Sequence, residues 1–256
     1  MDSLPNLEVV RAVSQVVRAT DAGEGMPSME VRFSSFGTWY EIDSMWEGNF
    51  LERTEHGAFA KTIAESADQI RVLFNHGFDP QIGQKVLGQT ESLTEEDDSP
   101  VGAVRLFDTS YVRDLLPGLK AGVYGSSFRM RVIRDEWNED PGVSEYNPKG
   151  IPERTIKEVR LFEFGPVTFP ANPSSTASVR SMTDAYVEGM RSRDPLWVDE
   201  LTRSRDALNF RTSPVRTAGD AAENPPTAPA ASHPGGMSAG ERRRRIYHLT
   251  PKEGQK

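Results

Sequence analysis

The sequence predicts an α+β fold in which strands outnumber helices. Several short segments alternate apolar and polar residues, as strands with one buried face do. A few segments instead space their apolar residues every three or four positions and carry helix start or stop signals. Turns rich in Gly, Pro or acidic residues separate these segments at short intervals. Because no segment repeats, we expect one strand-rich body with a few helices.

The first predicted elements are two strands, a helix and a third strand. Met29–Phe33 and Trp39–Ile42 alternate in polarity. Residues 57–67 (GAFAKTIAESA) repeat apolar side chains every fourth position, which predicts a helix. Residues 69–75 (QIRVLFN) form a compact apolar run bounded by polar residues, which predicts a buried strand.

The middle of the chain predicts a hairpin followed by a helix. Residues 85–93 and 101–107 are strand-like, and the acidic turn at 95–100 predicts the hairpin tip. Residues 108–122 begin with a capping residue and end on a glycine, as a helix does. Pro117 lies inside this helix, where a kink is expected.

The last predicted elements are two strands and two helices. Residues 123–133 and 154–169 are apolar strands, and the polar segment 135–153 predicts a hairpin connection between them. Residues 182–210 predict two short helices with a break near Asp194–Pro195.

Residues 211–256 differ in composition from the rest of the chain. They contain eight basic and four acidic residues, a net charge of about +4. Since the whole chain carries −8, the preceding residues carry about −12. The stretch between Phe210 and Tyr247 has no aromatic residue and is rich in Ala, Pro, Gly and Ser. Such a segment buries too little apolar surface to offset its ordering entropy, so we expect a disordered tail. Its Arg242–Arg245 cluster is expected to be solvated.

Composition excludes several classes of function. The chain has no Cys, which removes disulfide scaffolds, Cys-based zinc sites and thiol nucleophiles. With only four His and no nucleotide or EF-hand motif, we expect neither a metal nor another cofactor. No apolar run reaches the roughly 20 residues of a membrane helix, and no signal-peptide pattern occurs. The net negative charge argues against a protein that binds mainly phosphate backbones.

Histidine, serine and carboxylates remain as the groups for catalysis. His233 and His248 lie in the predicted tail, and His56 precedes a helix. His76 directly follows the buried strand 69–75, where it can be held rigidly beside solvent. A positioned histidine base is what makes a serine hydroxyl nucleophilic.

Two neighbouring segments supply the other candidates. Ser126 and Ser127 lie in an apolar strand, and alternation directs them to opposite faces. Strict alternation places Glu163 on one face with Val159 and Leu161. A carboxylate on an apolar face needs a partner, and a histidine would serve.

Four segments, in this order, resemble the prohead (head maturation) serine proteases of tailed bacteriophages, of which herpesvirus assemblins are more distant relatives. They read FLERTEHGAFAKTI, RVLFNHGFDPQIGQ, LLPGLKAGVYGSSFRMRV and EVRLFEFGPVTFPANP. The resemblance runs from about Met29 to Ser175. It implies an assemblin-like closed or partly closed β-barrel with surrounding helices.

The resemblance also implies a catalytic set. The family's histidine base falls on His76, its serine nucleophile on Ser127 and its acidic residue on Glu163. Glu158 stays open as an alternative third member, and Ser126 as an alternative serine. Relatives often have a small residue two positions after the serine, whereas this chain has Arg129, which is expected to reshape the substrate groove.

With the resemblance, the chain divides into four predicted regions. These are an N-terminal arm with room for a short helix or strand (1–28), a serine protease domain (29–178), a helical extension (179–210) and the disordered tail (211–256).

The implied function is a capsid maturation endopeptidase that uses Ser–His–acid acyl transfer. Its implied substrates are the scaffolding protein or scaffolding domain of the major capsid protein, and the protease itself. The implied setting is the assembling procapsid in the host cytoplasm, with a homodimer expected and with neither membrane nor nucleic acid as partner.

Three alternatives remain open. The chain is a catalytically silent scaffolding or capsid-assembly protein that kept the fold, a serine hydrolase of small esters, or a nucleic-acid binder that uses Arg242–Arg245. The intact His76, Ser127 and Glu163 set argues against the first. The absence of a GxSxG nucleophile elbow argues against the second, and the acidic body argues against the third.

Overall fold

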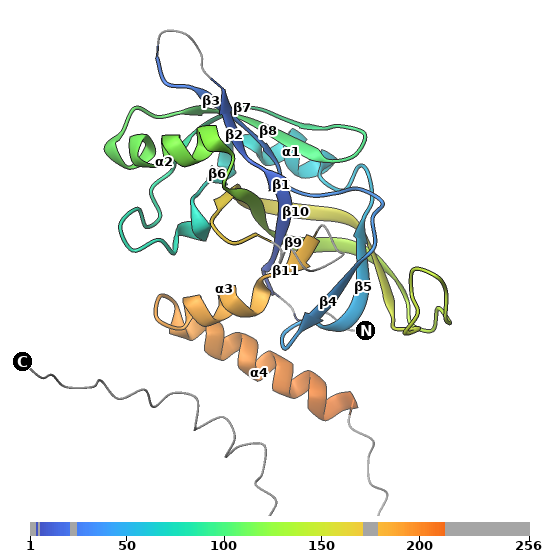
Figure 1. Cartoon of the computed structure of the whole chain (residues 1–256). Helices are drawn as coiled ribbons and strands as arrows, with labels where there is room; N and C mark the ends of the chain where they lie inside the picture. The colour runs from blue at the N-terminus through green and yellow to red at the C-terminus, as the bar shows by residue number, and fades with distance from the viewer. Residues whose placement is uncertain (1–3, 5, 21–24, 171–178, 213–256) are drawn as a thin grey trace, which may run out of the picture. The chain divides into compact units, whose positions relative to one another are not determined.

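A computed structural model describes residues 4, 6–20, 25–170 and 179–212 (Figure 1). Within these residues it contains eleven strands, four α-helices and two short 3₁₀ turns. The predicted α+β class with a majority of strands is therefore confirmed.

Seven strands form sheet A in the order β11–β1–β9–β10–β5–β4, with β6 pairing with β10 off this path. Its centre is the long antiparallel pair β9–β10, and both β5 and β6 run parallel to β10, at opposite ends of it. The strands are β1 (Val9–Val16), β4 (Tyr40–Ser44), β5 (Gly48–Thr54), β6 (Arg71–Val72), β9 (Gly125–Asn138), β10 (Glu153–Val167) and β11 (Val179–Ser181).

Four strands form sheet B in the order β2–β3–β8–β7. They are β2 (Arg18–Thr20), β3 (Ser28–Arg32), β7 (Gly88–Glu95) and β8 (Pro100–Leu106). The hydrophobic core joins the two sheets. Phe33, which follows β3, contacts the rings of Phe128 on β9 and Phe164 on β10, and all three are fully buried. Burying aromatic rings supplies a large share of core stability.

The expected closed or partly closed barrel is not formed. Among the described residues, sheet A runs as an open path from β11 to β4, and sheet B from β2 to β7. No strand of one sheet pairs with a strand of the other in this part of the chain. The β1–β9 ladder shifts register between Val13 and Val16, and the chain then enters sheet B as β2. Two packed sheets bury the apolar strand faces without ring closure.

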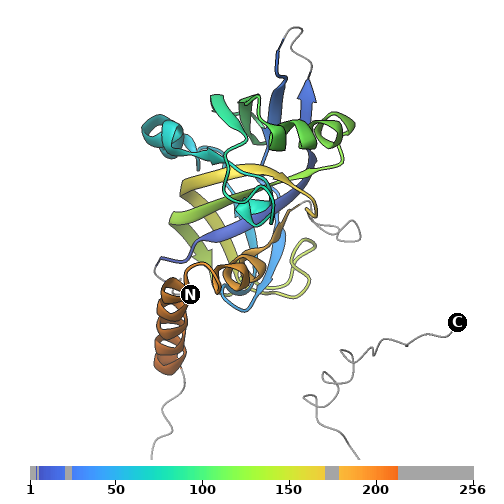
Figure 2. The same ribbon diagram turned by 90° about the vertical axis from the view of Figure 1, so that its left-hand side faces the viewer.

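The helices lie at two opposite ends of the sheets (Figures 1 and 2). Helices α1 (Ala60–Ser66) and α2 (Ser110–Ala121) lie at one end, whereas α3 (Thr183–Met190) and α4 (Pro195–Thr212) lie at the other. Gly122 follows the last residue of helix α2, and its φ of 66° is a left-handed conformation that glycine adopts without strain. The predicted break near Asp194–Pro195 separates α3 from α4 as expected.

One prediction about local structure needs correction. The apolar run 69–75 contributes only the two-residue strand β6, after which the chain turns into a 3₁₀ turn, η2 (Asn75–Gly77). Within the predicted N-terminal arm (1–28), residues 9–16 form β1, which lies in sheet A between β11 and β9. Both segments pair with strands that lie far away in the sequence.

The predicted tail (211–256) lies outside the described residues apart from the end of α4, and the remaining domain boundaries stay predictions. No helix in the described part of the chain is long and apolar enough to cross a membrane.

Candidate active site

The three candidate residues meet on the face of sheet A that points away from sheet B. His76 Nε2 lies 2.7 Å from Ser127 Oγ, and His76 Nδ1 lies 2.5 Å from Glu163 Oε1. The Ser127 residue and the Glu163 side chain are almost completely buried, and the His76 ring is only slightly exposed. Residues separated by 51 and 87 positions in the sequence thus form one hydrogen-bonded chain.

A β-bulge places Glu163 at this site. In the β9–β10 ladder Leu161 pairs with Met130 and Glu163 pairs with Arg129, so Phe162 is an extra residue on β10. Cross-strand partners share a face, and neighbours along a strand do not. Glu163 therefore lies on the opposite face from Leu161, and the sequence prediction that the two share a face is wrong. Because of the extra residue, the Glu163 side chain faces His76 and not the apolar core.

The geometry distinguishes the two serines. Ser127 pairs with Gly165 and lies on the same face as Glu163. Ser126 points the other way and donates a hydrogen bond to the carbonyl of Arg32, at the end of β3. The predicted opposite orientation of the two serines is confirmed, and only Ser127 contacts His76.

The geometry also distinguishes the two carboxylates. Glu158 forms ion pairs with Lys61 and Arg134, and its side chain is partly exposed. Glu163 is the carboxylate that contacts His76. The remaining described histidine, His56, lies against the ring of Phe36 at a centroid distance of 5.1 Å.

A left-handed turn presents the His76 ring. Asn75, His76 and Gly77 have φ values of 47°, 55° and 73°, and the first two conformations cost strain because side chains disfavour them. Two contacts hold the turn. Thr168, which follows β10, donates its N–H to Asn75 Oδ1 at 2.9 Å, and Arg193 Nη2 donates to the Gly77 carbonyl at 2.6 Å. Strain held by surrounding contacts is common at functional sites.

The segment that precedes His76 passes close to β10 because Gly165 has no side chain. A Cβ at Gly165 would lie 2.0 Å from the Leu73 carbonyl oxygen. Since Gly165 pairs with Ser127, the missing side chain lets the backbone leading to His76 pass directly beside the serine.

The Ser127 hydroxyl has two acceptors for one proton. Its Oγ lies 2.7 Å from His76 Nε2 and 2.8 Å from the Arg11 carbonyl oxygen on β1. When the imidazole is neutral with its proton on Nδ1, the hydroxyl can donate to Nε2. When the ring is protonated on both nitrogens, Nε2 donates to Oγ and the hydroxyl turns to Arg11. The arrangement accommodates both protonation states.

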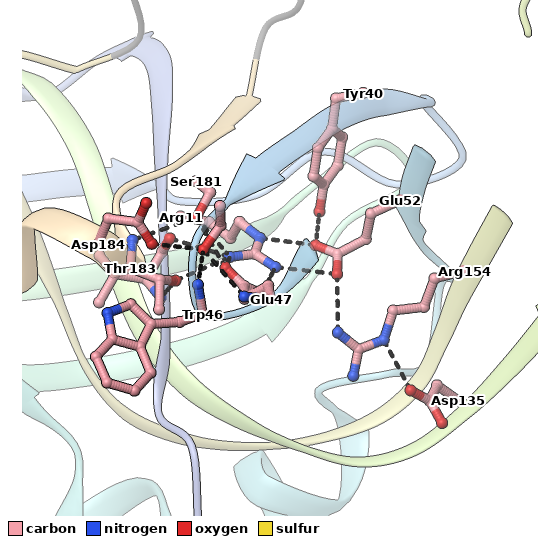
Figure 3. A network of polar contacts seen from close by, with 12 residues as sticks. Arg11, Tyr40, Trp46, Glu47, Glu52, Asp135, Arg154, Ser181, Thr183 and Asp184 are labelled. Carbon is pink, nitrogen blue, oxygen red and sulfur yellow. Dashed lines mark hydrogen bonds and ion pairs between the residues drawn. The ribbon is translucent and has the colours of Figure 1, made fainter. Parts of the chain in front are cut away.

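The Arg11 side chain anchors β1 through a buried ionic cluster (Figure 3). Its guanidinium lies between Glu47 and Glu52, with N···O distances of 2.6 and 2.7 Å. Glu52 also accepts hydrogen bonds from Tyr40 and Arg154. The cluster fixes the strand whose Arg11 carbonyl faces Ser127.

A guanidinium lies beside the carboxylate end of the hydrogen-bonded chain. Arg129 Nε lies 3.6 Å from Glu163 Oε1, and Arg129 Nη1 forms an ion pair with Glu8. Its guanidinium is 5.3 Å from the ring centroids of both Phe162 and Tyr186. Burial alone would lower the pKa of Arg129, but the charges of Glu163 and Glu8, with the coulombic effect of Tyr186 and the hydrogen bond that Arg129 donates to Glu8, outweigh burial and raise that pKa.

A cavity of about 260 Å³ opens beside His76. Its lining comes from Glu8, from the segment that follows β6, from Arg129 on β9, and from the α3–α4 segment, which includes Tyr186 and Trp197. Burial raises the pKa of Tyr186 to about 12, so its phenol is neutral at physiological pH. Among the described residues, no cluster of three or more His, Asp or Glu side chains is arranged to hold a metal ion.

Comparison with known proteins identifies the family. Residues 15–188 match the model of the caudovirus prohead serine proteases. The chain belongs to this family. The matched region contains all three residues of the His76–Ser127–Glu163 chain. This prohead protease is therefore a serine protease, as the sequence resemblance implied.

Other comparisons add little. A solved structure of the bacteriophage T4 capsid assembly protease, gp21, aligns over 56% of this chain and 98% of its own, with 10% identity and a TM-score of 0.33. No curated protein matches this sequence.

Sequence reasoning did not identify three contributors to the site. Arg11 contributes a main-chain carbonyl, which no side-chain pattern predicts. Glu8 and Arg193 lie outside the residues matched to the family, and they reach the site only through tertiary packing. Arg129 departs from the family pattern in the sequence, but its ion pair with Glu163 depends on the bulge at Phe162.

Proposed function

We propose that this prohead protease is a capsid maturation endopeptidase in which Ser127 is the nucleophile, His76 the general base and Glu163 the orienting acid. The observation that supports these roles is the continuous chain of contacts from Glu163 through His76 to Ser127 Oγ. Neutral serine is a weak nucleophile, and a histidine within hydrogen-bond distance can take its proton as it attacks.

The proposed reaction is acyl transfer. Ser127 Oγ bonds to the scissile carbonyl carbon while its proton moves to His76 Nε2. The tetrahedral intermediate collapses, the peptide C–N bond breaks, and His76 gives the proton to the leaving amine. Water then hydrolyses the acyl-enzyme by the reverse sequence of proton transfers. Glu163 stabilises the imidazolium through Nδ1. Because Ser127 is fully buried, substrate binding has to expose its Oγ.

The proposed substrates follow from the family. They are the scaffolding protein or scaffolding domain of the major capsid protein, and the protease itself, inside the assembling procapsid in the host cytoplasm. We also propose a homodimer as the active form, and removal of the tail (211–256) by self-cleavage.

Co-expression with the major capsid protein and its scaffold tests this proposal. Wild type should yield shortened capsid or scaffold chains, identified by mass spectrometry, and Ser127→Ala should yield intact chains. The intact mass of the protease itself, in wild type and Ser127→Ala, reports self-cleavage. Uncut partners with wild-type protease would favour the catalytically silent scaffolding protein instead.

A further inference from the structure

The surroundings of Glu163 contain a charge pair that the triad itself does not explain. The Arg129 guanidinium lies 3.6 Å from the same Glu163 oxygen that contacts His76 Nδ1. Its other side is paired with Glu8, which precedes β1. Glu8 also lies 3.7 Å from Arg131, two residues further along β9. The positive charge next to the triad thus has its own counter-ion.

The position of Arg129 is fixed by packing as well as by charge. The guanidinium contacts the rings of Phe162, the bulged residue of β10, and Tyr186 on α3. Its side chain is only 21% exposed. A charge held at one place in a largely buried site interacts more strongly than one in water, because less solvent screens it.

We propose that Arg129, with Glu8 as its counter-ion, is a positioning residue that sets the pH at which the His76–Glu163 pair takes up the proton that stops catalysis. This inference rests on the proposed function of the triad. A cation near the pair opposes the addition of any proton to it, whether the proton goes to the ring or to the carboxylate. Arg129 therefore keeps the pair ready to accept the Ser127 proton at lower pH.

The remaining charged groups around the pair do not change this sign. Tyr186 on α3 is neutral at the pH values concerned, since burial raises its pKa to about 12. Arg193 and Asp194, between α3 and α4, line the same cavity, and Arg193 donates to the Gly77 carbonyl. These groups are the same in every variant below.

The pH dependence of the rate at which a fluorophosphonate probe phosphonylates Ser127 tests the proposal. In Arg129→Met the midpoint of the acid limb should move up by about one pH unit, because an opposite charge at this distance has been removed from Glu163 and a like charge from protonated His76. In Glu8→Gln it should move down by about half a unit, because Arg129 loses its counter-ion. Arg129→Lys keeps the positive charge and should restore most of the wild-type midpoint.

Arg160→Met is the matched control. The Arg160 guanidinium lies 5.5 Å from the centroid of the same Phe162 ring. Arg160→Met changes the net charge by the same amount as Arg129→Met. Because Arg160 is solvent-exposed, its charge is screened, and the midpoint should stay within about 0.2 units of wild type. A purely structural role for Arg129 would lower the rate at all pH values without moving the midpoint.

Two outcomes would overturn the proposal. They are an unshifted midpoint in Arg129→Met, or an upward shift in Glu8→Gln. If Arg129→Met does not fold, the downward shift in Glu8→Gln alone decides the matter. The ring-proton NMR signals of His76, assigned by their loss in His76→Ala, give the same midpoint without any reaction. Absence of probe on wild-type Ser127 would instead reject the proposed function.

Discussion

Two buried carboxylates on strands of sheet A, Glu52 and Glu163, have opposite surroundings. Glu52 accepts from Arg11 Nε at 2.7 Å, from Tyr40 at 2.8 Å and from Arg154 at 3.3 Å, so both its oxygens are bonded. Glu163 contacts His76 and Arg129 through Oε1, and its buried Oε2 has no hydrogen-bond partner among the described residues.

In the proposed mechanism, this difference separates a structural carboxylate, Glu52, from a carboxylate that takes part in catalysis, Glu163. Permanent cations and a phenol saturate Glu52, and the resulting cluster holds β1, β5 and β10 together (Figure 3). Glu163 has capacity left for positive charge, and the proposed reaction creates such a charge on His76. A preorganised charged group lowers the activation barrier when it stabilises the transition state more strongly than the ground state.

The largest expected effect comes from neutralising Glu163, the proposed orienting acid. Glu163→Gln keeps the shape of the side chain but removes the charge that stabilises the imidazolium, so peptide cleavage should slow by about 10²–10⁴-fold. The free energy of unfolding should change little, because Arg129, which lies 3.6 Å from Glu163 Oε1, keeps its ion pair with Glu8. Steady-state kinetics and urea unfolding measure the two quantities.

Glu158→Gln is the control for that variant. Glu158 is the alternative third member, and its ion pairs with Lys61 and Arg134 lie at the surface. It should retain near wild-type cleavage. The reverse result, with Glu158→Gln inactive and Glu163→Gln active, would move the acid role to Glu158.

Neutralising the structural carboxylate should have the opposite result. Glu52→Gln leaves Arg11 with Glu47 alone and Arg154 with Asp135 alone as counter-charges, and breaking a buried ion pair on one side costs about 3–5 kcal/mol of unfolding free energy. The folded fraction should keep much of its cleavage rate. Glu41→Gln on the adjacent strand, which breaks an exposed pair with Lys149, should cost less than about 1 kcal/mol. Equal losses of unfolding free energy in Glu52→Gln and Glu41→Gln would contradict the structural role of Glu52.

The pH dependence of this cost is a smaller effect that sharpens the comparison. Burial by itself would raise the pKa of Glu52, but the charge of Arg11 and its hydrogen bonds outweigh burial and lower that pKa below 4.5. A carboxyl with a lowered folded-state pKa contributes stability above its unfolded pKa and loses it as pH falls through the folded value.

The stability gap between wild type and Glu52→Gln should therefore be constant near neutral pH and narrow below about pH 4.5. Urea unfolding at several pH values measures it. A gap that stays the same down to acid unfolding would show that Glu52 carries no lowered pKa.

Part of the fold and of the candidate site can be predicted from the sequence, and the rest depends on tertiary contacts. Alternation and turn residues locate most strands and the α3–α4 break, because these signals are local. The family resemblance points to His76, Ser127 and Glu163, which the structure brings together. The face occupied by Glu163 could not be predicted, since it depends on an unpaired Phe162 that only the register with β9 reveals.

The N-terminal region illustrates the same limit. Val9–Val16 lies inside sheet A because its partners are β9 and β11, more than a hundred residues later. Arg11 is completely buried, which sequence patterns do not anticipate for an arginine, and only the positions of Glu47 and Glu52 account for it. The barrel expected from the resemblance likewise required edge-strand pairing, which is a property of the tertiary structure.

The central claim is that His76 makes the Ser127 hydroxyl reactive, and mapping a fluorophosphonate adduct by peptide mass spectrometry tests it most directly. The adduct should lie on Ser127 and should be lost in His76→Ala. It should remain in Ser126→Ala, because the Ser126 hydroxyl points towards the Arg32 carbonyl and away from His76. An adduct on Ser126, or equal labelling of Ser127 with and without the imidazole, would contradict the account.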